Sequence, residues 1–178
     1  MATRWEPSPT PGDAGAFRAT WHDVEERWVD TVERARELPA GGEHERVAGE
    51  WSFVETLRHL VFVTDAWVSR AVLGVSAPYH PLGLPPTGMT KPPLPGDLEA
   101  RPTLDEVLLL RAQRQATVRE VLGWMTDAGL DASVRVRGPG HPRAGVLAAR
   151  RSLTVVVHEE WRHRLYAERD LAALLGPR

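Results

Sequence analysis

The sequence predicts an all-α protein, an antiparallel four-helix bundle with a long proline-rich loop between its second and third helices. Three observations lead to this fold class. Four long segments carry apolar residues three or four positions apart, which is the spacing of amphipathic helices. Two of these segments begin with a capping box, and strand-like alternation is confined to residues 134–137. Long amphipathic helices with few strands are typical of helix bundles.

The first two helices follow an extended, proline-containing segment at residues 1–12. The first helix is predicted over residues 13–38, and the Pro39-Ala40-Gly41-Gly42 stretch ends it. The second begins with Ser52 as its cap, with Glu55 three residues later, and continues to about Leu73. His59 lies at the edge of the apolar arc of this second helix.

The second half of the chain begins with a proline- and glycine-rich segment, residues 76–96, where few backbone donors can pair regularly. We predict an ordered irregular loop there, and long loops of this kind often cover sites. Thr103 and Glu106 cap a third helix that ends near Gly129, and a fourth helix begins between residues 145 and 152 and ends at Leu175. We assign four tryptophans to the bundle core: Trp21, Trp28, Trp67 and Trp124.

Length and composition predict one domain over residues 1–178 and narrow the range of functions. The formal net charge is −2, which gives no electrostatic footprint for nucleic acid or an anionic membrane. The chain has no cysteine, so disulfides, thiolate zinc sites and cysteine nucleophiles are excluded. We see no signal peptide and no apolar run that would span a membrane. We therefore expect a cytoplasmic protein with a small-molecule substrate.

The last helix carries two glutamates and two histidines in close succession. At about 100° per residue, Glu159 and His163 project from one face of the helix, about 40° apart, whereas His158 and His163 diverge by about 140°. We expect Glu159 and His163 on the buried side, and His158 on a solvated face with Arg162. A buried carboxylate and imidazole need a partner, which would be a metal ion or an arginine from another helix.

His59 is the only histidine on the predicted second helix, and a bundle can place it opposite the last helix. His59, Glu159 and His163 would form a metal site with one coordination position open, as in catalytic centres. Two nitrogens and a carboxylate suit zinc, nickel or ferrous iron better than calcium or magnesium. The alternative is ordinary hydrogen bonding or packing by these residues. His80 would either cap the site or serve only as a loop residue.

Other chemistry finds no support. A metalloprotease helix needs a histidine four residues after His158, and Arg162 stands there. No serine lies in a nucleophile elbow, and the Gly138-Pro139-Gly140 turn does not follow a strand into a phosphate-binding helix. Arginines in the second half of the chain predict a solvated basic surface or, alternatively, a dock for an anionic ligand. They are Arg135, Arg137, Arg143, Arg150 and Arg151.

Several short motifs, in this order and spacing, resemble the DinB superfamily, in the branch near mycothiol-dependent maleylpyruvate isomerases. The resemblance spans about residues 51–174. Its motifs are Gly49-Glu50-Trp51-Ser52, Thr56-Leu57-Arg58-His59-Leu60, Tyr79-His80-Pro81-Leu82-Gly83-Leu84-Pro85, Glu159-Glu160-Trp161-Arg162-His163-Arg164-Leu165-Tyr166-Ala167 and Arg169-Asp170-Leu171. The resemblance implies a four-helix bundle, often a homodimer, that binds a divalent metal through three histidines.

In that family one histidine comes from the second helix and two, four residues apart, come from the fourth. His59 and His163 match the first and last of these ligands, while Glu159 occupies the middle position. His158 would replace it only if the helix were locally overwound. The resemblance also implies a transferase or isomerase that uses a low-molecular-weight thiol. If the three residues hold a metal ion, we expect Arg58 or Arg164 to support the ligands. The alternative is a non-catalytic bundle that binds a small ligand or a protein partner, with the three residues as a structural cluster.

Overall fold

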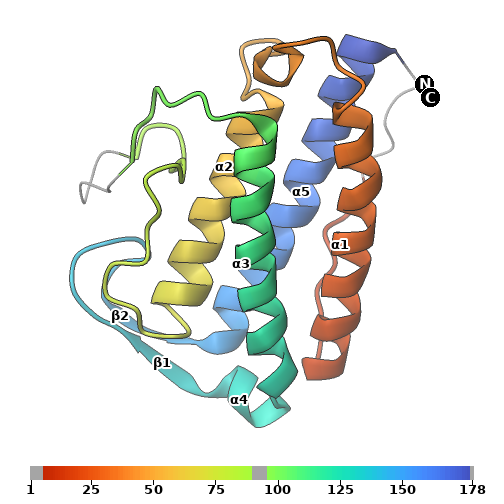
Figure 1. Ribbon diagram of the computed structural model, residues 1–178. Helices are drawn as coiled ribbons and strands as arrows, with labels where there is room; N and C mark the ends of the chain where they lie inside the picture. The colour runs from red at the N-terminus through yellow and green to blue at the C-terminus, as the bar shows by residue number, and fades with distance from the viewer. Residues whose placement is uncertain (1–5, 90–95, 177–178) are drawn as a thin grey trace.

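The computed structural model describes residues 6–89 and 96–176, and four long helices dominate it (Figure 1). These helices are α1 (Ala14–Ala35), α2 (Phe53–Thr64), α3 (Leu104–Trp124) and α5 (Ala149–Leu175). A π-helical turn, η2 (Asp65–Arg70), extends α2. The shorter elements are η1 (Gly42–His44), α4 (Asp127–Asp131) and two strands, β1 (Ser133–Val136) and β2 (Gly145–Ala148).

The four long helices form a bundle in which α1 and α2 each pack against both α3 and α5. The long loop between α2 and α3 carries the chain back along the bundle, so these two helices run in the same direction (Figure 1). Both are antiparallel to α1 and α5. The structure therefore confirms the predicted all-α bundle and the long loop between its second and third helices.

Local side-chain chemistry explains where these helices begin. The Ser52 side chain accepts a hydrogen bond from the Glu55 backbone N–H, and the Glu55 carboxylate accepts one from the Ser52 N–H at 2.8 Å. Thr103 and Glu106 form the same reciprocal pair at the start of α3. Such a cap satisfies backbone donors that the first helical turn leaves free and contributes about 1 kcal/mol. Both predicted capping boxes are confirmed.

The third helix ends earlier than the sequence suggested. We expected it to continue to about Gly129, but α3 ends at Trp124 and a separate short helix, α4, follows. The break occurs because the Thr126 side chain accepts a hydrogen bond from the Gly129 N–H and caps the new helix. The extended stretch predicted around residues 134–137 is present as β1, which pairs antiparallel with β2 in a hairpin that leads into α5.

The core consists of two clusters of buried apolar side chains along the bundle. Trp21 and Trp28 are buried there, as predicted. The placement of Trp124 in the core was wrong, because its side chain is 54% exposed. The buried stripe of α3 passes through Val118, Val121 and Leu122, and Trp124 falls outside it. Among the described helices, none is long and apolar enough to cross a membrane.

Candidate metal centre

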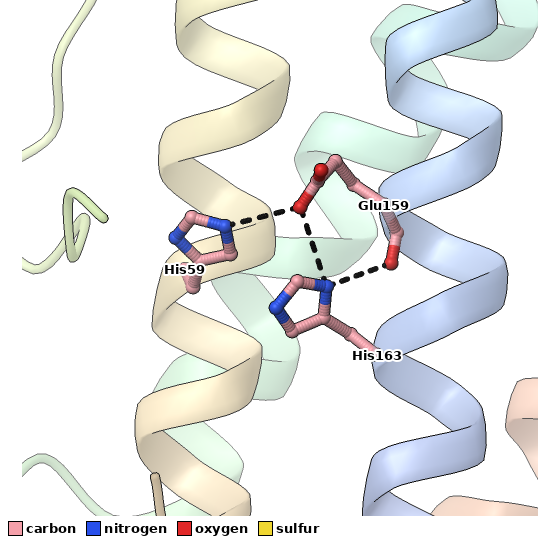
Figure 2. A group of neighbouring side chains, drawn as sticks. All are labelled: His59, Glu159 and His163. Carbon is pink, nitrogen blue, oxygen red and sulfur yellow. Dashed lines mark hydrogen bonds and ion pairs between the residues drawn. The ribbon is translucent and has the colours of Figure 1, made fainter. Parts of the chain in front are cut away.

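The structure brings the three predicted ligands together between α2 and α5 (Figure 2). His59 projects from the middle of α2, and Glu159 and His163 project from successive turns of α5. One ligand atom from each of the three side chains lies within 4.8 Å of the others. His59 is buried, whereas Glu159 and His163 are half-buried at the edge of the helix interface. The two α5 residues that the sequence predicted to share a face, Glu159 and His163, therefore do lie together beside His59.

The neighbouring Glu160 shows where that argument was incomplete. Glu160 is only 2% exposed and is therefore the deeply buried glutamate of α5. Its two carboxylate oxygens accept hydrogen bonds from Arg111 of α3, each at 3.0 Å. The partnership of a buried acid with an arginine from another helix thus occurs at Glu160. Glu159, one residue earlier, faces the two imidazoles.

The hydrogen bonds of His59 determine which of its nitrogens faces Glu159. Its Nδ1 lies 2.9 Å from the carbonyl oxygen of Leu84. A carbonyl oxygen can only accept, so we assign the proton to Nδ1. Nε2 then points towards the Glu159 carboxylate, with 3.3 Å between Nε2 and Oε2. In a neutral imidazole this leaves two lone pairs facing each other, so the contact requires a cation, either a second proton on the ring or a metal ion.

His163 and Glu159 have the protonation states that metal binding needs. Burial and the nearby charge of His59 lower the pKa of His163 to about 4, so its ring is neutral at pH 7. The hydrogen bond with His59 lowers the pKa of Glu159 against the opposing effect of burial, so this carboxylate is ionised. The Nδ1 of His163 donates to the Glu159 backbone carbonyl at 2.9 Å. Within the described residues no protein group bonds to its Nε2, which leaves this nitrogen available.

These donors fit a divalent transition-metal ion. Two atoms bound to one ion at about 2.1 Å lie about 3.0–3.4 Å apart. The 3.3 Å between His59 Nε2 and Glu159 Oε2 falls in this range. Metal-bound histidines usually donate their other ring N–H to a carbonyl or carboxylate, and His59 and His163 each donate to a backbone carbonyl. His59 and Glu159 therefore have the spacing of two ligands of one ion, and backbone carbonyls orient both imidazoles.

One neighbour of the cluster was missed from the sequence. The indole of Trp51 lies against both imidazoles, with ring centroids 4.7 Å from His59 and 6.1 Å from His163. Trp51, His163 and Tyr166 also line a cavity of about 540 Å³, together with the hydroxyl-bearing residues Thr56 and Thr87. Trp51 precedes the cap of α2, so helical periodicity could not place it. Its position in the first resemblance motif was the only available signal.

The remaining histidines that we considered do not join the cluster. His158 is half-buried, and its Nε2 lies 3.0 Å from the Pro9 carbonyl oxygen, so the expected solvated face was wrong. The segment before α1 covers it there. The Nδ1 of His80 accepts from the Leu82 N–H at 3.1 Å, and its backbone N–H donates to Asp65. His80 is therefore a structural loop residue.

The predicted supporting arginines and the basic cluster also lie elsewhere. Arg164 stacks over the Trp161 ring, 5.7 Å from its centroid, and has no contact with the three ligands. Arg58 donates only to backbone carbonyls. Of the basic cluster, Arg150 pairs with Asp131, whereas Arg135, Arg137, Arg143 and Arg151 are exposed.

The structure defines a helix bundle with a long connection between its second and third long helices. Two imidazoles and a carboxylate face each other between its second and last long helices, an arrangement that could hold a metal ion. Comparison with protein families shows which family the chain belongs to. Residues 8–167 match the model of the DinB superfamily, and the chain belongs to that superfamily. Neither a search of curated proteins nor a search of solved structures found a match.

Proposed function

We propose that this protein binds a divalent transition-metal ion through His59, Glu159 and His163 and acts as a metal-dependent enzyme. The observation that supports it best is the His59 contact pair: both ring nitrogens face oxygen acceptors, so either a proton or a metal ion has to lie between Nε2 and the Glu159 carboxylate. Zinc, nickel and ferrous iron are the ions that two imidazoles and one carboxylate favour. Three protein ligands leave room for a further ligand from substrate.

The cavity beside His163 supports the enzymatic part of the proposal. Ligand sites combine apolar walls with a few polar groups, and here the rings of Trp51 and Tyr166 provide apolar walls. Polar and charged side chains complete the lining: Thr56, Thr87, Arg46, Glu50 and Asp170. A substrate in this cavity would contact His163 directly. The chain would thus hold the substrate next to the cluster.

We further propose that the substrate or co-substrate is a low-molecular-weight thiol, as the resemblance to mycothiol-dependent maleylpyruvate isomerases suggests. When bound, the ion would lower the pKa of a coordinating thiol and make it nucleophilic. The chain has no cysteine, so the thiol would have to come from solution. The expected cytoplasmic location would keep such a thiol reduced.

Metal binding is tested by loading chelator-treated, untagged protein with Co²⁺ or Zn²⁺. We expect one equivalent to bind, with visible Co²⁺ absorption bands from nitrogen and oxygen ligands. The variants His59→Gln, Glu159→Gln and His163→Gln should each weaken binding at least about tenfold. His158→Gln, on the same helix but outside the cluster, is the matched control and should bind like the unmodified protein. Unmodified protein that binds neither ion would overturn the proposal.

The thiol part is tested separately on the Co²⁺-loaded protein. Addition of a small thiol such as 2-mercaptoethanol should produce a sulfur-to-cobalt charge-transfer band that the His158→Gln control retains. If the ion binds but no thiol produces this band, the thiol assignment fails while the metal site stands. If no ion binds and Glu159→Gln only changes stability, the three residues form the structural cluster of a non-catalytic bundle.

A further inference from the structure

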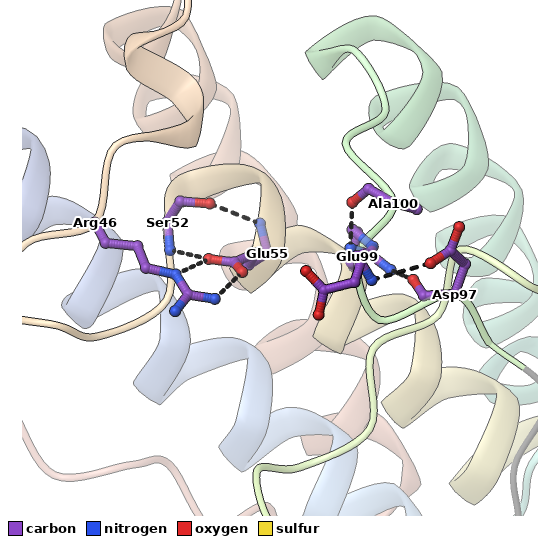
Figure 3. A network of polar contacts seen from close by, with 7 residues as sticks. Arg46, Ser52, Glu55, Asp97, Glu99 and Ala100 are labelled. Carbon is purple, nitrogen blue, oxygen red and sulfur yellow. Dashed lines mark hydrogen bonds and ion pairs between the residues drawn. The ribbon is translucent and has the colours of Figure 1, made fainter.

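Arg58 is a buried guanidinium with an unusual set of acceptors. Its side chain is only 1% exposed, one residue before His59 on α2. It donates to three backbone carbonyls: those of Leu82 at 2.9 Å, Ala100 at 2.6 Å and Asp97. Figure 3 labels Asp97 and Ala100, the residues before α3 whose carbonyls accept two of these hydrogen bonds. No carboxylate in the described chain bonds to it.

These acceptors lie at both ends of the proline-rich loop. Leu82 stands in its first part, and Asp97 and Ala100 stand where the chain approaches α3. A buried arginine remains charged, and leaving its donors unpaired would be costly. The guanidinium therefore holds the two ends of the loop in fixed positions on α2. Backbone donors add to this hold: the Asp97 N–H donates to the Pro81 carbonyl at 3.0 Å, and the His80 N–H donates to Asp65 at 2.9 Å.

The same part of the loop determines how His59 is oriented. Leu84 follows Leu82 by two residues, is buried, and donates its N–H to the Arg58 carbonyl at 3.1 Å. Its own carbonyl accepts from Nδ1 of His59 at 2.9 Å. Two consecutive residues of α2 thus bind the loop: Arg58 donates to the Leu82 carbonyl, and His59 donates to the Leu84 carbonyl. Movement at Leu82 would shift the acceptor that fixes the His59 ring.

We infer that Arg58 is a positioning residue: through the proline-rich loop, it holds the Leu84 carbonyl in place, so that His59 keeps its hydrogen bond from Nδ1 to this carbonyl and directs Nε2 at Glu159. Loss of the Arg58 side chain would leave the three ligands in the chain but free the ring of His59 to turn away from this carbonyl. Groups that orient metal ligands in this way typically contribute about 10- to 100-fold in metal affinity. This consequence for affinity rests on the proposed metal site, whereas the orientation of the ring does not.

The test compares Arg58→Met with Arg70→Met. Arg70 is also buried, and its donors also reach only backbone carbonyls, those of Ser76, Arg137, Gly138 and Pro142. It contacts none of the residues that hold His59. Both variants lose a buried arginine, so a general loss of stability should appear in both. Only Arg58→Met should change His59.

The readout is the Nδ1–H hydrogen bond of His59 in metal-free, ¹⁵N-labelled protein, seen by NMR as a downfield ring N–H signal that is protected from exchange with water and is assigned with His59→Gln. We expect this signal in the unmodified protein and in Arg70→Met, and its loss in Arg58→Met. Zinc affinity should fall at least about tenfold in Arg58→Met and stay within about twofold in Arg70→Met. An unchanged Nδ1–H signal in Arg58→Met would overturn the inference.

A second variant tests the loop without removing the arginine, should Arg58→Met fail to fold. Gly83 lies between Leu82 and Leu84, and an added Cβ would meet the His80 carbonyl oxygen at 3.1 Å and Phe62 at 3.5 Å. Gly83→Ala should therefore displace the loop by a few tenths of an ångström and weaken the hydrogen bond from Nδ1 of His59 to the Leu84 carbonyl. A Gly83→Ala protein with an unaltered Nδ1–H signal counts against the inference. If the signal changes as expected but no protein binds zinc, the metal proposal alone fails.

Discussion

Two consecutive glutamates of α5 illustrate how a difference of about 100° around a helix separates two roles. Glu160 faces the bundle interior and forms a two-fold hydrogen-bonded pair with Arg111. Arg111 also lies over the Trp28 ring, 5.0 Å from its centroid. Glu159 faces the edge of the interface, where its partners are the two imidazoles. Glu160 therefore supports the fold, and Glu159 is available for chemistry.

Substitution of Glu160 should mainly lower stability, whereas substitution of Glu159 should mainly abolish metal binding. Glu160→Ala leaves the Arg111 charge buried without a partner, so we expect the free energy of unfolding to fall by about 3–5 kcal/mol. Glu159→Ala should cost much less stability but abolish metal binding. Urea denaturation in the presence of a chelator measures the first effect, and zinc titration measures the second. The double variant Arg111→Met/Glu160→Met should recover much of the lost stability, and equal losses in the two single variants would contradict this division.

Trp51 should report directly on the cluster, because its ring lies against both imidazoles. We expect Ni²⁺, an ion with a partly filled d shell, to quench part of the tryptophan fluorescence on binding. Trp51→Phe should remove most of this quenching while keeping an aromatic ring beside the ligands. Trp124→Phe is the matched control, since Trp124 lies at the end of α3 and is exposed. Equal quenching in both variants would show that the ion binds elsewhere.

At this scale, helical spacing alone identified Glu159 and His163 as neighbours. It could not distinguish Glu160 as the buried acid, because its partner, Arg111, is 49 residues away. It also could not place Trp51, which lies outside any helix, beside the imidazoles. Side chains that are neighbours on one helix can be identified from the sequence, whereas contacts between different elements can be identified only once their packing is known.

At the scale of elements, the start of α2 is stabilised by more than its cap. The Glu55 carboxylate accepts from the Ser52 N–H and from Arg46, whose Nε lies 2.9 Å away (Figure 3). Burial acts to raise the pKa of Glu55, but the hydrogen bonds from Arg46 and Ser52 outweigh it and lower the pKa to about 2. The ionised form is thus favoured by folding. Because α2 carries His59, this cap also fixes the first turns of the helix that holds a ligand.

The lowered pKa of Glu55 predicts a pH dependence. The unfolded pKa is about 4.3, so the stabilisation is fully present above that pH and is lost as the pH falls towards 2. We expect Glu55→Gln to lower the free energy of unfolding by about 1 kcal/mol at pH 7, since solvent screens this partly exposed pair. The difference from the unmodified protein should shrink between pH 4.3 and 2. Urea denaturation at several pH values measures it.

The matched control for this prediction is Glu106→Gln, in the capping box of α3. Glu106 makes the same hydrogen bonds to Thr103 but is exposed, and none of the described arginines bonds to its carboxylate. Its substitution should have a smaller effect over the same pH range. A Glu55→Gln protein whose deficit persists unchanged at pH 2 would show that the carboxylate charge is not what stabilises the cap.

Elements whose boundaries depend on local chemistry were predictable, and the others were not. Both capping boxes consist of residues three apart, so the starts of α2 and α3 were readable directly. The strand β2 was missed because only its pairing with β1 makes it a strand. The break before α4 was missed because Thr126 is a cap only if the preceding helix has already ended.

At the scale of the whole molecule, the candidate site exists because packing brings together residues 100 positions apart. His59 and Glu159 meet only where α2 lies against α5. The contact between His59 and Glu159 was predicted from the general geometry of bundles and from the resemblance to the DinB superfamily. No local sequence pattern predicts it. An ion held there would link the second helix to the last, so that binding and folding would be coupled.

That coupling predicts a thermal shift. An ion that binds only the folded protein should stabilise it by about 2.7 kcal/mol at a free concentration 100 times Kd. For a chain of 178 residues this corresponds to a rise in Tm of roughly 5–10 °C. Scanning calorimetry of chelator-treated protein with and without zinc measures the shift, and His158→Gln should show all of it. His163→Gln should show little, because it retains the bundle but leaves only one ligand on α5. A rise in Tm of equal size in His163→Gln would show that the ion binds at another site. The stabilisation by zinc would then not come from the cluster between α2 and α5.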